Sequence, residues 1–195
     1  RTPWGDAVNF DGPYSDEVRR FFTENALYWI SEFRIDALRI DAIHGIYDFS
    51  AKPFLLELTE AVHTYAKETG RYIYIIAESD LNDPRTVSAP ETGGYGLDCQ
   101  WNEDFHHSLH VLLTGEKTGY YEDFGMTEDM EKAMTEGFVY GGSYSAYRKR
   151  SHGNSSEKVP AHGFVVFSQN HDQVGNRAKG DRLSSILSFE KLKLA

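Results

Sequence analysis

Three acidic residues of this chain each follow an apolar, strand-like run, and this arrangement most constrains the fold. Asp41 ends the run ALRID, Glu78 ends YIYIIAE, and Asp172 follows GFVVFSQNH. If these runs are parallel strands of one sheet, their carboxyl ends share one edge of that sheet. The pattern therefore predicts an α/β fold that gathers three carboxylates at a common rim.

Helix-like segments separate the strand-like runs, and this alternation is typical of a parallel α/β architecture. Strands are expected over residues 37–41, 72–77, 97–100 and 163–168. Helices are expected over residues 15–33, 51–68 and 104–113, after 127, and from 181 to 195. Four strand-plus-helix units are half of the eight in a closed (β/α)₈ barrel. We therefore expect part of such a barrel.

Local signals predict where some of these elements begin and end. Ser15 and Ser50 are expected to cap the first two helices, and Gly70 to end the second. Helical spacing predicts a buried stripe on the first helix, formed by Val18, Phe22, Ala26, Trp29 or Ile30, and Phe33. The segment SHGNSSEKVP at 151–160 is expected to be a loop.

The two ends of the chain lack ordinary start and stop signals. It begins at Arg1 without methionine, and its last helical pattern reaches Ala195 with no capping glycine or proline. We therefore expect the chain to be a piece of a longer protein.

Composition excludes several classes of partner. The formal net charge is −10 and no basic face is evident, so nucleic acid is not an expected ligand. No apolar run approaches membrane-spanning length, so no membrane partner is expected. The lone Cys99 precludes an intrachain disulfide, which is consistent with a cytoplasmic location. The sequence does not specify an oligomeric state.

Two or three convergent carboxylates are what cleavage of a glycosidic bond requires. Arg39 lies two positions before Asp41, so both side chains point the same way, and a guanidinium there favours an ionised nucleophile. Glu78 follows an apolar strand, where partial burial favours the protonated form that a general acid needs. Asp172 would stay ionised and stabilise positive charge on the sugar.

Each acid also has a structural explanation. Asp41 could cap the turn that follows it with Arg39 as its partner, and Glu78 could form a rim salt bridge. His171 alone is more often a satisfied polar residue than a functional one. Taken together, however, the structural explanation requires several coincidences at three separate strand ends.

The segment DFHHSLH at 104–110 raises the question of a metal site. His106 and His110 lie on one helical face, but His107 stands where a zinc-protease helix carries its glutamate. No cysteine cluster supports a metal site. We expect neither a metal nor a cofactor, and interpret this segment as a polar helix start near the cleft.

Three motifs at these strand ends, DALRIDAIH (36–44), IIAESD (75–80) and FSQNHD (167–172), resemble signature segments of the α-amylase family of glycoside hydrolases. The resemblance implies that Asp41 is the nucleophile, Glu78 the acid/base and Asp172 the third catalytic acid. It implies that Arg39, His44 and His171 also belong to the site and contact substrate. Asp80, Trp4 and Trp101 are further candidate sugar contacts near the rim, although Asp80 could instead be structural and Trp101 could be a core residue.

Further segments, including TPWGDAVNFDG and NHDQVGNR, resemble members that hydrolyse the α-1,4 bond beside the terminal trehalose of maltooligosyltrehalose. The resemblance implies that residues 1–195 are about strands 4–7 of the catalytic TIM barrel with their helices, without the first three strands and the last. Two alternatives stay open. One is an α-1,4-glucan branching enzyme, a transferase with similar motifs, and the other is an inactive barrel fragment that only binds carbohydrate.

Overall fold

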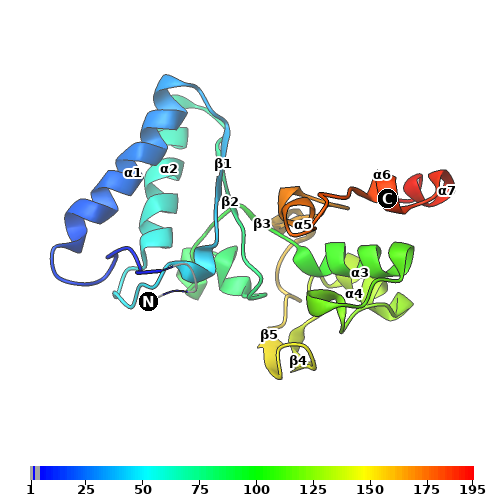
Figure 1. Cartoon of the computed structure of the whole chain (residues 1–195). Coiled ribbons are helices and arrows are strands. Elements are labelled where there is room, and N and C mark those ends of the chain that lie inside the picture. The colour runs from blue at the N-terminus through cyan, green and yellow to red at the C-terminus, as the bar shows by residue number, and fades with distance from the viewer. Residues whose placement is uncertain (1, 3–4) are drawn as a thin grey trace. The chain divides into compact units, whose positions relative to one another are not determined.

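The computed structural model describes residue 2 and residues 5–195, and it divides the chain into two compact units. The N-terminal unit comprises residues 1–101 and the C-terminal unit residues 102–195. Figure 1 labels most of their helices and strands. Trp4, predicted to contact substrate, lies outside the described residues.

The N-terminal unit alternates helices with parallel strands, as the sequence predicts. Its elements are α1 (Ser15–Glu32), β1 (Ala37–Ile40), α2 (Phe54–Thr69), β2 (Tyr74–Ala77) and β3 (Cys99–Trp101). β1 pairs with β2 and β2 with β3, both in parallel, with Ile40 opposite Ala77. This register brings the residues that follow β1 and β2 to the same edge of the sheet.

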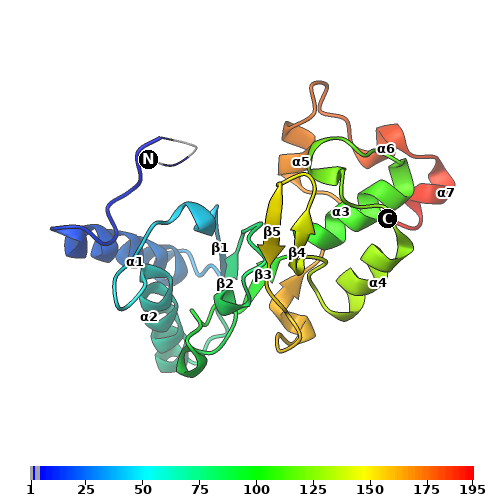
Figure 2. The same ribbon diagram turned by 90° about the horizontal axis from the view of Figure 1, so that it is seen from below.

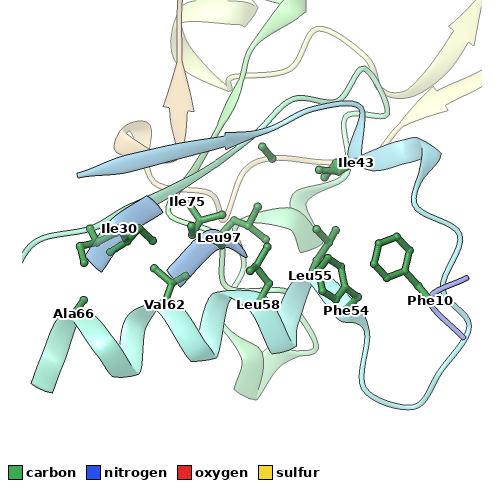
Figure 3. Close-up of a cluster of buried hydrophobic side chains, with 13 residues drawn as sticks. Phe10, Ile30, Ile43, Phe54, Leu55, Leu58, Val62, Ala66, Ile75 and Leu97 are labelled. Atoms are coloured by element: carbon green, nitrogen blue, oxygen red, sulfur yellow. The ribbon is translucent and has the colours of Figure 1, made fainter. Parts of the chain in front are cut away.

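The core of this unit lies between α2 and the sheet. Apolar side chains of α2 point toward the strands in Figure 3, where Val62 lies near Ile75 and Leu97. Val62 and Ile75 are fully buried. The apolar face of helix α2 and the apolar strands therefore form one continuous core, because a parallel sheet is buried under its helices.

The ends of α1 and α2 differ in part from the sequence prediction. Ser15 is the first helical residue rather than the cap. The amide of Phe54 donates to the Asp48 carboxylate at 2.5 Å, so Asp48 takes the capping role predicted for Ser50. Gly70 does end α2 in the left-handed region, with φ of 64°.

The predicted buried stripe of α1 is only partly correct. Ala26 and Ile30 are buried, whereas Phe22, Trp29 and Phe33 are exposed. Instead α1 buries Arg19, whose guanidinium is bound by two carboxylates and two backbone carbonyls. A buried charge is tolerated there because it is fully hydrogen-bonded, and helical periodicity alone gives no sign of it.

The C-terminal unit contains helices, a hairpin and one very short strand. Its elements are α3 (Glu103–Thr114), α4 (Thr127–Thr135), β4 (Gly141–Ser145), β5 (Arg150–Gly153), β6 (Phe164–Val165), α5 (His171–Gly175), α6 (Leu183–Ile186) and α7 (Phe189–Leu192). α3 packs on α4. The antiparallel β4–β5 hairpin, visible in Figure 2, was not predicted, and its second strand begins the segment predicted as a loop.

The last predicted helix is also interrupted. Extended backbone at Leu187 and Ser188 separates α6 from α7, and the Ser188 hydroxyl caps α7 by accepting from the amide of Lys191. Serine favours caps over helix interiors because its hydroxyl competes for backbone groups. Within the part of the chain that the structure describes, no helix is long and apolar enough to cross a membrane.

Candidate active site

Arg39 and Asp41 lie at the carboxyl end of β1 and form an ion pair. Arg39 Nη1 is 2.5 Å from Asp41 Oδ1. The Asp41 side chain is 76% exposed, so its carboxylate is accessible to a ligand. The turn after Asp41 is capped at Ala42 without a side-chain hydrogen bond. The structural alternative, in which Asp41 is a helix cap, is therefore wrong, and the predicted pairing with Arg39 is confirmed.

Glu78 follows β2 and lies beside the same arginine. Its backbone amide donates to the Ile40 carbonyl, and its own carbonyl accepts from the amide of Ile43. The Ala42 amide donates to Glu78 Oε2 at 2.6 Å, and Arg39 Nη2 lies 3.8 Å from that same oxygen. The other oxygen, Oε1, has no hydrogen-bond partner among the described residues. Oε1 is therefore the atom available to carry a transferable proton.

The Ala42 amide is a site group that sequence reasoning missed. Ala42 adopts the left-handed region, with φ of 42° and ψ of 50°, which is costly for a residue with a β-carbon. This conformation coincides with the hydrogen bond from its amide to Glu78. Strained backbone held by its surroundings is common at functional sites. Because alanine carries no polar side chain, the sequence offers no signal for this contact.

Trp101 holds the guanidinium from the other side. The Arg39 guanidinium carbon lies 4.1 Å from the centre of the Trp101 ring, within cation–π range. Trp101 ends β3, so a side chain from β3 packs on Arg39 of β1, which lies beside both acids. The structure shows that Trp101 packs on Arg39, and its predicted contact with substrate stays a prediction.

His44 and Asp80 lie close to one another on the loops after β1 and β2. His44 Nδ1 is 4.0 Å from Asp80 Oδ1. Both loops begin directly after a catalytic candidate, so the pair is near enough to contact a polar ligand bound at the sheet edge. Arg39 and Asp41 also line a cavity of about 370 Å³, whose other walls are mainly apolar side chains of α1, β1 and α2.

His171 and Asp172 lie in the C-terminal unit, in the first turn of α5. The sequence prediction placed Asp172 just beyond a strand that ended at residue 168, but β6 ends at Val165. Asn170 caps α5, because its side-chain oxygen accepts from the Asp172 amide at 2.9 Å. The side chains of His171 and Asp172 are 69% and 50% exposed, and His171 Nε2 is 3.6 Å from Asp172 Oδ1.

The three histidines of α3 are buried rather than forming a polar helix start. His106 Nδ1 is 2.8 Å from the Ser168 carbonyl oxygen, and its Nε2 is 2.9 Å from the Tyr121 hydroxyl. Burial lowers the pKa of His106 to about 4. His110 Nε2 is 2.9 Å from Glu116 Oε2. Among the described residues, no group of three His, Cys, Asp or Glu side chains is arranged to hold a metal ion.

The structure thus brings together Arg39, Asp41, Glu78 and Trp101 within the N-terminal unit. Two acids of different exposure share one arginine: Asp41 is open to solvent, whereas the side chain of Glu78 is only 16% exposed. Paired carboxylates in unlike environments are suited to divide the roles of nucleophile and acid between them.

Comparisons with known proteins identify relatives of this chain. No family model matches the chain. It is 49% identical over its whole length to a malto-oligosyltrehalose trehalohydrolase of Saccharolobus solfataricus, covering 34% of that protein. It is 48% identical over 93% of its length to one of Arthrobacter ramosus, covering 32% of that protein. The chain therefore spans about a third of the length of these curated relatives.

A solved structure described as an α-amylase of Salmonella typhimurium matches the entire chain with a TM-score of 0.87 and 38% identity, over 33% of its own length. This match confirms an α-amylase-like α/β fold with a parallel sheet. Together with the curated relatives, it confirms the similarity to the α-amylase family that the three motifs indicate. The relatives also confirm the similarity to malto-oligosyltrehalose trehalohydrolases that further segments, such as TPWGDAVNFDG and NHDQVGNR, indicate.

Proposed function

We propose that this chain carries catalytic residues of a retaining glycoside hydrolase that cleaves the α-1,4 bond beside the terminal trehalose of maltooligosyltrehalose. One observation carries the proposal. Arg39 lies between an exposed carboxylate, Asp41, and a largely buried one, Glu78, whose Oε1 is available to carry a proton. The names of the relatives support the choice of substrate.

In the first step, Asp41 attacks the anomeric carbon of the glucose that is linked to trehalose. The bond from that carbon to the trehalose oxygen breaks, and Glu78 transfers its proton to this oxygen. Arg39 donates a charged hydrogen bond to the Asp41 carboxylate and so orients it for the attack. Trehalose leaves, and a glycosyl ester of Asp41 remains.

In the second step, water replaces trehalose. Glu78, now ionised, accepts a proton from the water as the oxygen attacks the anomeric carbon, and the ester bond to Asp41 breaks. Two displacements on one carbon retain the α configuration. Water as the acceptor distinguishes this hydrolase from a glucan transferase.

We further propose that Asp172 stabilises the positive charge that develops on the same sugar, with His171, His44 and Asp80 hydrogen-bonding to its hydroxyl groups. The order of the three motifs along the chain supports this assignment. Trp101, whose ring also packs on the guanidinium of Arg39, and Trp4 remain proposed sugar contacts.

The parallel order β1–β2–β3 and the length of the relatives support the proposal that residues 1–195 are part of a TIM barrel, about its strands 4–7. The complete enzyme then holds the remaining strands. The single cysteine, Cys99, agrees with the cytoplasmic location that we propose.

A branching transferase is the second candidate, because one with 32% identity matches 70% of the chain. The test uses the full-length enzyme that contains this sequence. It is incubated separately with maltooligosyltrehalose, with plain maltooligosaccharide and with amylose, and free trehalose and α-1,6 linkages are quantified. Trehalose release from the first substrate, with little cleavage of the others, supports the proposal. New α-1,6 branches, or equal cleavage of all three, would overturn it.

The catalytic assignment is tested separately with the variant Asp41→Asn. We expect it to lose nearly all turnover while it still binds maltooligosyltrehalose, because asparagine keeps the shape of the side chain but is not a nucleophile. Turnover close to that of the wild type would show that Asp41 is not the nucleophile, whatever the substrate.

A further inference from the structure

Helix α3 holds the segment that carries Asp172 at two points, one on each side of that residue. Before it, His106 Nδ1 is 2.8 Å from the Ser168 carbonyl oxygen. After it, the Gln173 side-chain amide donates to Glu103 Oε2 at 3.1 Å. All of these residues belong to the C-terminal unit. Helix α3 therefore fixes the position of the short turn between Ser168 and Gln173.

The His106 contacts specify which ring nitrogen carries the proton. A carbonyl oxygen can only accept, so His106 Nδ1 donates to Ser168. Nε2 is then the acceptor and the Tyr121 hydroxyl, 2.9 Å away, donates to it. Burial raises the pKa of Tyr121, which keeps this donor protonated. His106 is itself fully buried and its ring stacks on that of Phe167. Contacts with Ser168, Tyr121 and Phe167 therefore fix the orientation of the His106 ring.

The anchored carbonyl is connected to Asp172 by a short series of contacts. Ser168 precedes the cap residue Asn170 by two positions, and the Asn170 side chain accepts the Asp172 amide. The backbone amide of Asn170 in turn donates to the side-chain oxygen Oε1 of Gln173 at 2.8 Å. A shift of the Ser168 carbonyl is therefore transmitted to the cap and to the start of α5. The Asp172 side chain itself is half exposed, and its backbone amide is held by the Asn170 cap.

We propose that His106 is a positioning residue for the reaction, which places the Asp172 carboxylate against the sugar through its hydrogen bond to the Ser168 carbonyl. This inference rests on the proposed function. His106 touches neither sugar nor reacting atoms in this role. His106 instead orients a catalytic group from outside the catalytic centre. Loss of such an orienting contact costs about 10–100-fold in activity.

Two substitutions of His106 separate positioning from simple packing. In His106→Asn, the side-chain amide lies where Nδ1 was and can still donate to Ser168, but the contact with Tyr121 is lost. In His106→Gln, the amide lies where Nε2 was and can still accept from Tyr121, but the contact with Ser168 is lost. Each variant removes one buried hydrogen bond, so both should lower the melting temperature by similar amounts.

The variants are made in the full-length enzyme, and kcat, KM and melting temperature are measured with maltooligosyltrehalose. We expect His106→Gln to lower kcat about 10–100-fold with little change in KM, and His106→Asn to keep kcat close to that of the wild type. Tyr121→Phe, which leaves the Ser168 contact in place, should also keep kcat. Asp172→Asn, measured alongside, gives the loss expected when the positioned group itself is disabled.

Equal losses of kcat in the asparagine and glutamine variants would overturn the positioning role and leave His106 as a packing residue. Full activity of His106→Gln would overturn it as well. If the wild type cleaves another α-glucan but releases no trehalose, the substrate proposal fails, and the same comparison on that glucan still tests His106. Absence of any glucan cleavage by the wild type would overturn both.

Discussion

Replacing Glu78 by glutamine tests the division of roles between the two acids most directly. The carboxylate accepts the Ala42 amide and approaches Arg39 through one oxygen only, Oε2. The carbonyl oxygen of glutamine can take over both contacts, which leaves the amide nitrogen at the place of Oε1. The side chain then keeps its position and loses only the ability to donate and accept a proton.

The expected loss is therefore chemical rather than structural. General acid catalysis contributes about 10²–10⁴-fold to rate, which is about 3–5 kcal/mol of the barrier. We expect Glu78→Gln to lower kcat on maltooligosyltrehalose by that factor, with KM and melting temperature near those of the wild type. Glu78→Ala is the structural control, because it also removes the acceptor of the Ala42 amide and should cost about 1–3 kcal/mol of stability.

A change of leaving group sharpens this assay. An α-maltooligosyl fluoride needs no proton donor, since fluoride leaves unaided, so Glu78→Gln should form the glycosyl ester of Asp41 from it at nearly the wild-type rate. Azide, which needs no general base, should then release the ester as a glycosyl azide that mass spectrometry detects. Equal defects with the fluoride and the natural substrate, or a wild-type rate with the natural substrate, would refute the assignment of Glu78 as acid/base.

Three further predictions concern the structure around the site. Leu58→Ala, in the core, should lower the free energy of unfolding by about 2–5 kcal/mol. The same change at exposed Leu194 should alter it by less than about 0.5 kcal/mol. Chemical denaturation of the two variants and the wild type measures both differences. The hydrogen bond to Asp98 raises the pKa of His63, so the stability advantage of the wild type over His63→Gln should be largest below about pH 6.5. That advantage should disappear as pH rises through the raised pKa, and a pH-independent difference would contradict it. Gly137→Ala should lower the melting temperature, because φ is +90° and a β-carbon would lie 2.4 Å from an aromatic ring, and an unchanged melting curve would disprove this reasoning.

Local signals in the sequence predicted the elements that depend on local chemistry. The apolar runs before Asp41 and Glu78 are parallel neighbours, because continuous apolar strands are stable only when both faces are buried. The capping glycine at Gly70 ends α2, because glycine enters the left-handed region without steric cost. The pairing of Arg39 with Asp41 follows from the two-residue period of a strand.

Local sequence signals could not predict contacts between residues that are far apart in the sequence. The cap of α2 comes from Asp48, two positions before the predicted cap Ser50, because a loop returns its carboxylate to the Phe54 amide. The histidines of α3 resemble a polar patch in sequence, yet they are buried. Ser168 and Tyr121 contact both ring nitrogens of His106, and Glu116 contacts Nε2 of His110.

The sequence by itself therefore predicted the reaction class, through three acids at the ends of strand-like runs and the motifs around them. Only the tertiary structure decided how Glu78 is held: by the amide of Ala42, a residue with no polar side chain to reveal it, and beside an arginine held against Trp101. Residue types and spacing specify which chemical groups a chain offers. The direction of a backbone amide, and the oxygen that it leaves available, arise only when the chain has folded.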